Sequence, residues 1–359
     1  MKKKFLYLYM MLMLVVSACS APAVQTEAPT VVSVAEPTAL PVDKPTAAPT
    51  EVVFEPVTIK INMSKLTSYA PIFLADQLGY FKKFGITLEP IQLNKNSDAL
   101  TLAISGDLDV YSGPVNAALL NTLSIEPALK VVGDRGYSEY GGCAYTALLV
   151  RKDLFESGEI TKPEDLKGRD VAVNSTSVTG WFFDNYMKTA GLSIDDVNLM
   201  DLPTNAYLDA FANKEATALV SPELHVTRLL KAGNVVLLSS STDFPSQQQG
   251  VLVFGKTMMQ DHPELGARFM AAYLMGAQKL AEGKTDENVN AIVAATSEDV
   301  ELIKEACWIS VSSDAMINFA ATDILQQWYV ERGLLDAPIT EEQFWTPKFI
   351  EEGAKLLNN

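Results

Sequence analysis

A run of small polar residues follows a short apolar segment near the middle of the chain. Val171–Val173 is followed by Asn174-Ser-Thr-Ser-Val-Thr-Gly180-Trp181. At the start of a helix, such side chains and the free backbone N–H groups beside them can bind a ligand. Ser and Thr also cap helices without any ligand, and Trp181 can either stack on a flat ligand or pack in the core. We therefore take these residues as candidate ligand contacts: Asn174, Ser175, Thr176, Ser177, Thr179 and Trp181.

Further candidates lie at the C-terminal ends of other predicted strands. Tyrosines at these positions can form aromatic walls, and a Ser-Gly-Pro turn exposes backbone amides. Arg135 is the one cation that we place near a cleft mouth, although exposure to solvent is its simpler interpretation. Glu223 can accept hydrogen bonds from ring N–H groups or merely favour the start of a helix. The candidates in these segments are Ser64, Tyr69, Tyr111, Ser112, Gly113, Tyr137 and Glu223.

The elements that carry these residues alternate between strands and helices. Apolar residues near helical spacing predict a helix over 71–84, and Gly191 and Gly233 are typical helix stops. Such alternation predicts a mostly parallel sheet covered on both faces, which binds ligands at the C-terminal ends of its strands. After residue 258 the pattern is mainly helical. The predicted strands are 57–62, 86–93, 109–111, 129–132, 170–173, 197–202, 218–220 and 235–238, and the other predicted helices are 98–105, 115–123, 178–190, 205–213 and 222–232.

Two apolar segments, 144–150 and 250–254, bracket the second series of strands and helices. Each leads into a charged turn, so we interpret them as two crossings between lobes. The sequence therefore predicts an α/β fold of two doubly wound lobes joined by a hinge, with a ligand cleft between the lobes. We place lobe 1 at 54–149 and 250–359, and lobe 2 at 150–249.

The N-terminus has the features of a lipoprotein signal peptide. Three lysines precede the apolar run 5–16, which is too short to span a hydrocarbon core about 30 Å thick. Val16-Ser-Ala-Cys19 follows, a cleavage site of small residues that ends on a cysteine. We predict a signal peptide at 1–18, a lipid on Cys19 and a Pro/Thr-rich linker at 19–53. The protein would then be anchored on the extracytoplasmic face of the cell membrane, in the periplasm where an outer membrane is present.

The composition and motifs argue against several other functions. The net charge of −16 is unsuited to binding nucleic acid or an anionic bilayer. His225 and His262 have no metal-ligand spacing, and we expect no catalytic residue, metal or cofactor. Gly250–Thr257 matches a phosphate-loop pattern, but its apolar interior predicts a strand instead of a loop. Cys143 and Cys307 fit two separate buried residues better than a disulfide.

Three motifs resemble those of a known protein family. They are Tyr69-Ala-Pro-Ile-Phe-Leu-Ala75 with Gly79-Tyr-Phe-Lys-Lys-Phe-Gly85, then Ala103–Val110, then Leu166–Val173. They resemble successive blocks of the solute-binding proteins of sulfonate, nitrate and thiamine-precursor ABC importers, over roughly residues 57–335. The resemblance implies a hinged type II periplasmic-binding fold without catalysis. It also puts the segments after Ser64, Tyr111 and Val173, together with Glu223, at ligand-contacting positions.

The resemblance does not fix the ligand, so several functions stay open. The candidate tyrosines and Trp181 suit a planar nitrogen heterocycle, with riboflavin as first choice and a thiamine pyrimidine precursor as second. One alternative is a sulfonate-, taurine- or nitrate-binding protein of the same class. Another is an exported enzyme or sensor domain. For a solute-binding protein the expected partners are the small-molecule solute, an ABC permease with its ATPase and the membrane through the lipid; we expect a monomer and no nucleic acid.

Overall fold

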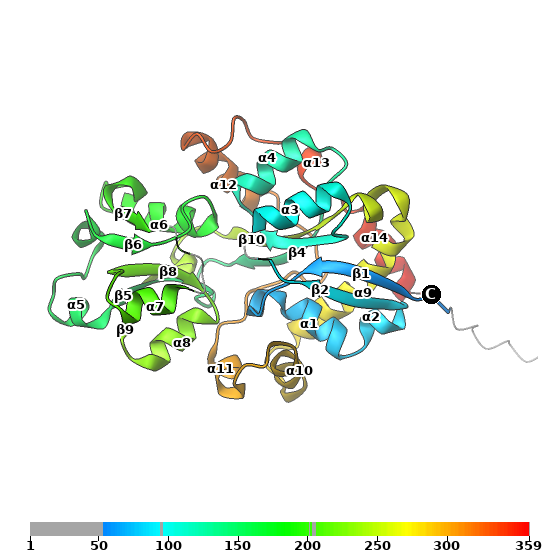
Figure 1. Ribbon diagram of the computed structural model, residues 1–359, viewed down its shortest axis with the longest axis horizontal. Coiled ribbons are helices and arrows are strands. Elements are labelled where there is room, and N and C mark those ends of the chain that lie inside the picture. The colour runs from blue at the N-terminus through cyan, green and yellow to red at the C-terminus, as the bar shows by residue number, and fades with distance from the viewer. Residues whose placement is uncertain (1–52, 94–95, 201, 203–205, 359) are drawn as a thin grey trace, which may run out of the picture. The chain divides into compact units, whose positions relative to one another are not determined.

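The computed structural model describes residues 53–93, 96–200, 202 and 206–358, which belong to one compact unit. The predicted signal peptide, Cys19 and nearly all of the predicted linker lie outside the described residues. Two five-stranded sheets, each with helices on both faces, make up two lobes (Figure 1). The predicted two-lobed α/β class is confirmed. Among the described residues, no helix combines the length and apolar character that a membrane span requires.

The sheet of the first lobe is built from strands far apart in the chain. Strand β1 pairs in parallel with β2 and β3. Parallel neighbours need a long crossover connection, and helices supply it here. Strand β10 lies between β3 and β4 and runs antiparallel to both. The strand order is β2 (Ile86–Ile91), β1 (Val57–Asn62), β3 (Val110–Pro114), β10 (Gln247–Phe254) and β4 (Lys130–Ser138).

Alternating side chains of β10 fill the cores on the two faces of this sheet. Val251 and Val253 face one core, and Leu252 and Phe254 face the other, as the two-residue period of a strand requires. Figure 1 shows α3 and α4 on one face and α1 and α9 on the other. The helices on the Val251 face are α3 (Asn96–Ser105), α4 (Ala117–Ile125), α12 (Ala320–Glu331) and α13 (Glu341–Phe344); those of the opposite core are α1 (Ala70–Gln77), α2 (Tyr80–Lys83), α9 (Pro263–Ala281), α10 (Asp286–Thr296), α11 (Val300–Glu305) and α14 (Lys348–Leu357).

The second lobe repeats this plan on a smaller scale. Leu149 and Leu219 contribute to a core with α7 and α8, whereas Leu148 and Val220 face the core that includes α6. Strand β5 runs antiparallel to its neighbours β8 and β9. The strand order is β7 (Asn198–Met200), β6 (Asp170–Ala172), β8 (Ala218–Pro222), β5 (Thr146–Arg151) and β9 (Val235–Ser240); the helices are α5 (Lys152–Glu156), α6 (Val178–Lys188), α7 (Tyr207–Ala212) and α8 (His225–Ala232).

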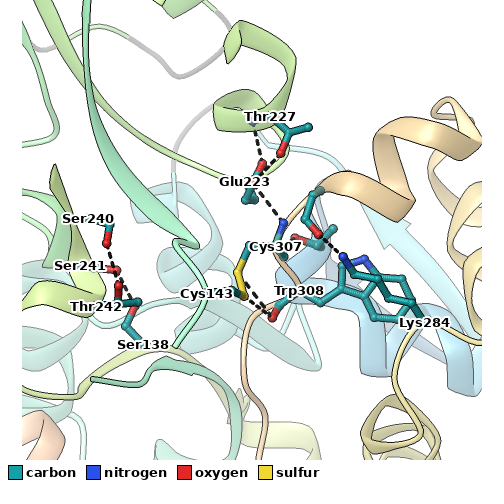
Figure 2. Close-up of a disulfide and its surroundings, with 12 residues drawn as sticks. Ser138, Cys143, Glu223, Thr227, Ser240, Ser241, Thr242, Lys284, Cys307 and Trp308 are labelled. Carbon is teal, nitrogen blue, oxygen red and sulfur yellow. Dashed lines mark hydrogen bonds between the residues drawn. A yellow bond between two sulfur atoms is a disulfide. The ribbon is translucent and has the colours of Figure 1, made fainter. Parts of the chain in front are cut away.

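The chain passes between the two sheets at residues 139–145 and 241–246, the first and second crossings. The predicted lobe limits at 149/150 and 249/250 therefore come a few residues too late. The apolar runs that we interpreted as crossings are mostly strand, because they pair as β5 and β10. The second crossing is mostly polar, and a hydroxyl–hydroxyl hydrogen bond of 2.9 Å between Ser138 and Ser241 lies where the two crossings begin (Figure 2).

Most of the predicted elements are present, and one predicted helix is divided in two. The helix expected over 71–84 is two helices, because Gly79 adopts a left-handed φ of 77° between α1 and α2. The segment that matched a phosphate loop is strand β10 as far as Phe254, as its apolar interior predicted. Shorter turns complete the fold: η1 (Thr67–Tyr69), η2 (Pro163–Leu166), η3 (Ile194–Asp196), η5 (Ser241–Asp243) and η6 (Thr257–Asp261).

Candidate functional site

The polar loop from Asn174 to Thr179 uses its hydrogen-bonding groups within itself. Asn174 Oδ1 accepts hydrogen bonds from the backbone N–H and the hydroxyl of Thr176, both at 3.1 Å. Ser177 caps α6 by accepting from Thr179 N at 3.3 Å, and the Thr179 hydroxyl donates to Asn174 O at 3.2 Å. Bonds within the loop and the cap of α6 therefore account for the side chains of Thr176, Ser177 and Thr179 and for the side-chain oxygen of Asn174. The loop also meets the first lobe, where Ala117 N donates to Thr176 O at 3.3 Å.

Two of the aromatic residues that we expected to face a ligand are packed in the core instead. Trp181 is 6 % exposed and lies edge-on to Phe244, with ring centroids 6.5 Å apart. Tyr111 is fully buried, and its hydroxyl donates to Pro114 O at 3.4 Å. Its ring occupies the space beside Gly113, where an added Cβ would lie only 2.2 Å from the Tyr111 hydroxyl oxygen. In this structure Gly113 thus makes room for Tyr111.

Ser64 and Tyr137 lie away from a common site. Ser64 is exposed in the loop after β1. Tyr137 is half-buried in β4, where its N–H donates to Ser310 O at 2.9 Å, and it lines a cavity of about 360 Å³ together with Lys284 and Trp308. A second cavity, of about 390 Å³, lies at the start of β1 beside Arg268.

Arg135 is buried, contrary to the simpler of its two interpretations. Arg135 is only 4 % exposed. Its Nη1 donates to Ser68 Oγ at 2.7 Å and to Ser68 O at 3.3 Å. The guanidinium carbon lies 4.3 Å from the centroid of the Tyr69 ring, a cation–π contact. Gly250 lies against the guanidinium, since a Cβ there would come within 2.4 Å of Nη2.

The positive charge of Arg135 has no close counter-charge. Within the described ranges, no carboxylate oxygen lies within 4 Å of its guanidinium. Its buried Nε has no hydrogen-bond partner, and neither has the buried hydroxyl of Ser112. Tyr69 joins these two residues, because it stacks under Arg135 and donates from its hydroxyl to Ser112 O at 2.9 Å. Burying unpartnered polar and charged groups is costly, so an added hydrogen-bond partner at these two atoms would be stabilising.

The neighbouring acid, Asp134, is committed to other partners. It accepts hydrogen bonds from Gly136 N at 2.6 Å, Gln248 Nε2 at 2.7 Å and Ser312 N at 2.7 Å. Burial raises the pKa of Asp134 to about 6, although these hydrogen bonds and the Arg135 charge act in the opposite direction. Asp134 therefore fixes the segment around Ser312 on the first lobe and only weakly neutralises Arg135.

Tyr145, at the end of the first crossing, is a site residue that the sequence reasoning missed. Its side chain is buried beside Ser68, and the charges of Arg135 and Glu223 both act on its hydroxyl. Burial raises the pKa of the Tyr145 hydroxyl to about 12, so it stays a neutral donor. We call Ser68, Tyr69, Ser112, Arg135 and Tyr145 the Arg135 cluster. Its position between two strands at a crossing is the only sequence signal that Tyr145 carried.

Glu223 is buried and joins the second lobe to the segment after α11 (Figure 2). Its Oε2 accepts from Thr227 N at 3.0 Å, and its Oε1 accepts from the Thr227 hydroxyl at 2.7 Å and from Cys307 N at 3.1 Å. Burial raises the pKa of Glu223, while these hydrogen bonds lower it. Glu223 thus stabilises the start of α8, as its position after Pro222 indicated, and in addition contacts Cys307.

Cys143 and Cys307 form a disulfide, so the prediction of two separate residues was wrong. They are 164 positions apart, and their Cα atoms lie 5.7 Å from each other. The first crossing and the segment after α11 are brought together only by the packing of the lobes. No local spacing could therefore have indicated this pairing.

Comparison with known proteins supports this fold. Residues 144–285, most of them in the second lobe, match the family described as NMT1/THI5 like. No curated protein sequence matches the chain.

Solved structures with the same fold cover most of the chain. The alkanesulfonate-binding protein SsuA from Xanthomonas axonopodis pv. citri, bound to MOPS, has a TM-score of 0.66 and 14% identity over 82% of this chain and 99% of its own. The periplasmic nitrate-binding protein NrtA from Synechocystis PCC 6803 has a TM-score of 0.65 and 12% identity over 84% and 89%. A ligand-binding component of an ABC-type import system from Staphylococcus aureus has a TM-score of 0.70 and 14% identity over 82% and 98%. The periplasmic-binding fold implied by the sequence motifs is therefore confirmed.

Proposed function

We propose that this protein is the extracytoplasmic solute-binding component of an ABC importer and that its solute is a small oxyanion, such as a sulfonate or nitrate. The fold is that of the sulfonate- and nitrate-binding proteins named above. The Arg135 cluster would hold the anionic group of the solute. The solute would then pass to a permease with its ATPase, with the protein as a monomer anchored through a lipid on Cys19.

The observation that carries this proposal is the unpartnered donor at Arg135. A guanidinium is permanently charged and presents N–H groups in a planar fork that matches an oxyanion. Here the Nε donor is buried and free, while Nη1 is held in place by Ser68. The Ser112 hydroxyl and the neutral Tyr145 hydroxyl supply further donors on adjoining elements. An anion would satisfy these groups and offset the cost of the buried charge.

The heterocycle hypothesis loses most of its basis. Trp181 and Tyr111, two of the expected aromatic walls, are already packed against protein atoms. Tyr69 stacks on Arg135 and so serves the cation. None of the similar structures named above is described as a riboflavin- or thiamine-precursor-binding protein. These ligands remain useful as competitors in the test.

Thermal unfolding with added solutes tests the proposal. A ligand at 100 times its dissociation constant stabilises the folded state by about 2.7 kcal/mol, which raises the midpoint by several degrees. We expect such a rise with taurine, an alkanesulfonate or nitrate, and none with riboflavin or an aminopyrimidine. A response to riboflavin or the aminopyrimidine without any response to the anions would overturn the assignment of an oxyanion.

An enzyme on this fold is the second candidate, since the desulfurization enzyme DSZB matches the chain with a TM-score of 0.61 and 15% identity. Both described cysteines are joined in the disulfide, and the described residues contain no cluster of three metal-ligating side chains. Incubation of the protein with each anion, followed by chromatography, distinguishes the two functions. A binding protein returns the anion unchanged, whereas turnover would favour the enzyme.

A further inference from the structure

Cys307 is a point at which three parts of the molecule meet (Figure 2). Its sulfur is bonded to Cys143 in the first crossing. Its backbone N–H donates to Glu223 Oε1 of the second lobe at 3.1 Å. Its carbonyl accepts a hydrogen bond from the Thr67 hydroxyl of the first lobe at 3.3 Å. One residue thus carries a contact to each lobe and a covalent bond to a crossing between them.

The segment that follows Cys307 is fixed to the first lobe. Tyr137 N donates to Ser310 O at 2.9 Å, and Ser312 N donates to Asp134 Oδ2 at 2.7 Å. Asp134 N in turn donates to Ala315 O at 2.8 Å. The disulfide therefore ties the first crossing to a firmly held part of the first lobe.

The first crossing connects the disulfide to the Arg135 cluster. Tyr145 N donates to Cys143 O at 2.8 Å, and Tyr145 O accepts from Glu223 N at 2.8 Å. The buried Tyr145 side chain lies beside Ser68, which accepts a hydrogen bond from Arg135 Nη1 at 2.7 Å. A displacement of Cys143 would therefore be passed to Tyr145 and to Glu223 through two short hydrogen bonds.

The other contacts near this junction are weaker. Helix α8 forms ion pairs with the first lobe through Arg228 and Glu298, at 2.6 Å, and through Lys231 and Glu305, at 2.9 Å. These side chains are a quarter to a half exposed, and exposed pairs contribute little because water and salt screen them. Glu223, at 3 % exposure, makes the buried contact at this junction. Its partner is the amide of Cys307, the residue to which the disulfide ties the first crossing.

We propose that the Cys143–Cys307 disulfide is a redox-sensitive latch that holds the second lobe closed over the Arg135 cluster. Cys143 is an exposed residue and Cys307 is partly exposed, so a small thiol can reach the disulfide bond. A dithiol reduces it by two successive thiol–disulfide exchanges. Each exchange forms one sulfur–sulfur bond and breaks another, and the two cysteines end as thiols while the dithiol becomes a cyclic disulfide. The two electrons and two protons come from the dithiol.

Reduction frees the first crossing from Cys307. Gly141 and Gly142 give this crossing two residues without side chains, and Gly141 has a φ of 70°. Tyr145 of the freed crossing, and with it Glu223, then shifts away from the Cys307 amide, which stays on the first lobe, and the second lobe opens. Where the solute is the oxyanion of the proposed function, on which this part of the inference rests, its affinity falls as the disulfide is reduced.

Hydrogen exchange on the full mature chain without solute tests the latch directly. We expect the amide of Cys307 to exchange at least ~10-fold faster in 5 mM dithiothreitol than in the oxidised protein. The double variant Cys143→Ser/Cys307→Ser should exchange as the reduced protein does at position 307 and show no response to dithiothreitol. Glu223→Gln is the matched control with an intact disulfide, and it should exchange faster at Cys307 under both conditions. Equal exchange at Cys307 in oxidised and reduced wild-type protein would overturn the latch.

Titration with ethanesulfonate, taurine and nitrate then separates the latch from the proposed function. For an anion that binds, we expect affinity to fall by about 10-fold on reduction. Unchanged affinity in the reduced protein would overturn the coupling between the disulfide and the site. If none of the three binds the oxidised protein, the proposed function fails, and the exchange experiment still decides whether the latch exists.

Discussion

The loop Asn174–Thr179 and the Arg135 cluster differ in how their polar groups are satisfied. The loop is the richer of the two in hydroxyl and amide side chains, but those groups bond to one another and cap α6. The Arg135 cluster also has five polar side chains, but two of them, Arg135 and Ser112, keep a buried atom without a partner. A ligand site is recognised by hydrogen-bonding capacity that the fold leaves unused, and this is not visible in composition.

The largest stability effect that we expect in either region comes from Trp181, at the end of the loop. Trp181→Ala should lower the free energy of unfolding by about 3–5 kcal/mol, because it leaves a cavity beside Phe244. Urea unfolding followed by circular dichroism measures this. Tyr140→Ala, at a residue 70 % exposed, is the control and should change it by less than about 0.5 kcal/mol. A loss as small as that of the control would return Trp181 to the list of ligand contacts.

Asp134 gives the Arg135 cluster a pH dependence that the loop lacks. Burial raises its pKa from 3.8 to about 6, so the folded protein binds a proton more tightly than the unfolded chain. Its contribution to stability is fully present below pH 3.8 and is lost as the pH rises through about 6, with a total on the order of 1–3 kcal/mol.

Urea unfolding at a series of pH values from 4 to 7 measures this slope. Asp134→Asn should reduce the dependence on pH in that window, whatever its effect on overall stability. An unchanged slope in the variant would show that Asp134 titrates at its ordinary pKa.

The cap of α6 provides a smaller test of the loop. Ser177→Ala removes the acceptor for Thr179 N and should cost about 1 kcal/mol, while Ser177→Asp should restore most of it. Affinity for the solute should stay within about twofold in both variants. If instead Ser177→Ala weakens binding as strongly as a change at Arg135, the loop is a ligand site and the contrast between the two regions disappears.

Ser112 should show the smallest stability effect, because its hydroxyl has no partner to lose. Ser112→Ala should change the free energy of unfolding by about 0.5 kcal/mol or less, since removing an unsatisfied buried group is nearly neutral. The measurement is again urea unfolding, without solute. A loss above about 1.5 kcal/mol would mean that the hydroxyl is already hydrogen-bonded and not available to an anion.

The sequence predicts the elements well and the site poorly, for physical reasons. Strand β1 and the Gly233 stop of α8 follow from local preferences that tertiary packing leaves unchanged. The burial of Arg135 depends on Gly250, which is 115 positions away in the sequence. Because Gly250 has no side chain, it leaves room for the guanidinium. The disulfide likewise depends on long-range packing.

The two aromatic predictions show a different limit. Trp181 lies in the first turn of a helix as predicted, whereas Tyr111, predicted at a strand end, is the second residue of β3; side-chain direction decided the role of both. A strand sends successive side chains to opposite faces, so Tyr111 packs in a hydrophobic core while Ser112, also buried, faces the other side of the sheet. Local pattern could not decide which of the two would be available to a ligand.

Calorimetric titration of Arg135→Gln tests the central claim most directly. Ethanesulfonate, taurine and nitrate are titrated into the wild-type protein, Arg135→Gln and Ser177→Ala under the same salt conditions. At least one anion should bind the wild type, and Arg135→Gln should weaken it by 2 kcal/mol or more, about 30-fold, while Ser177→Ala stays within about twofold. Equal affinity of the wild type and Arg135→Gln for the anion that binds would contradict the assignment of the Arg135 cluster as the solute site.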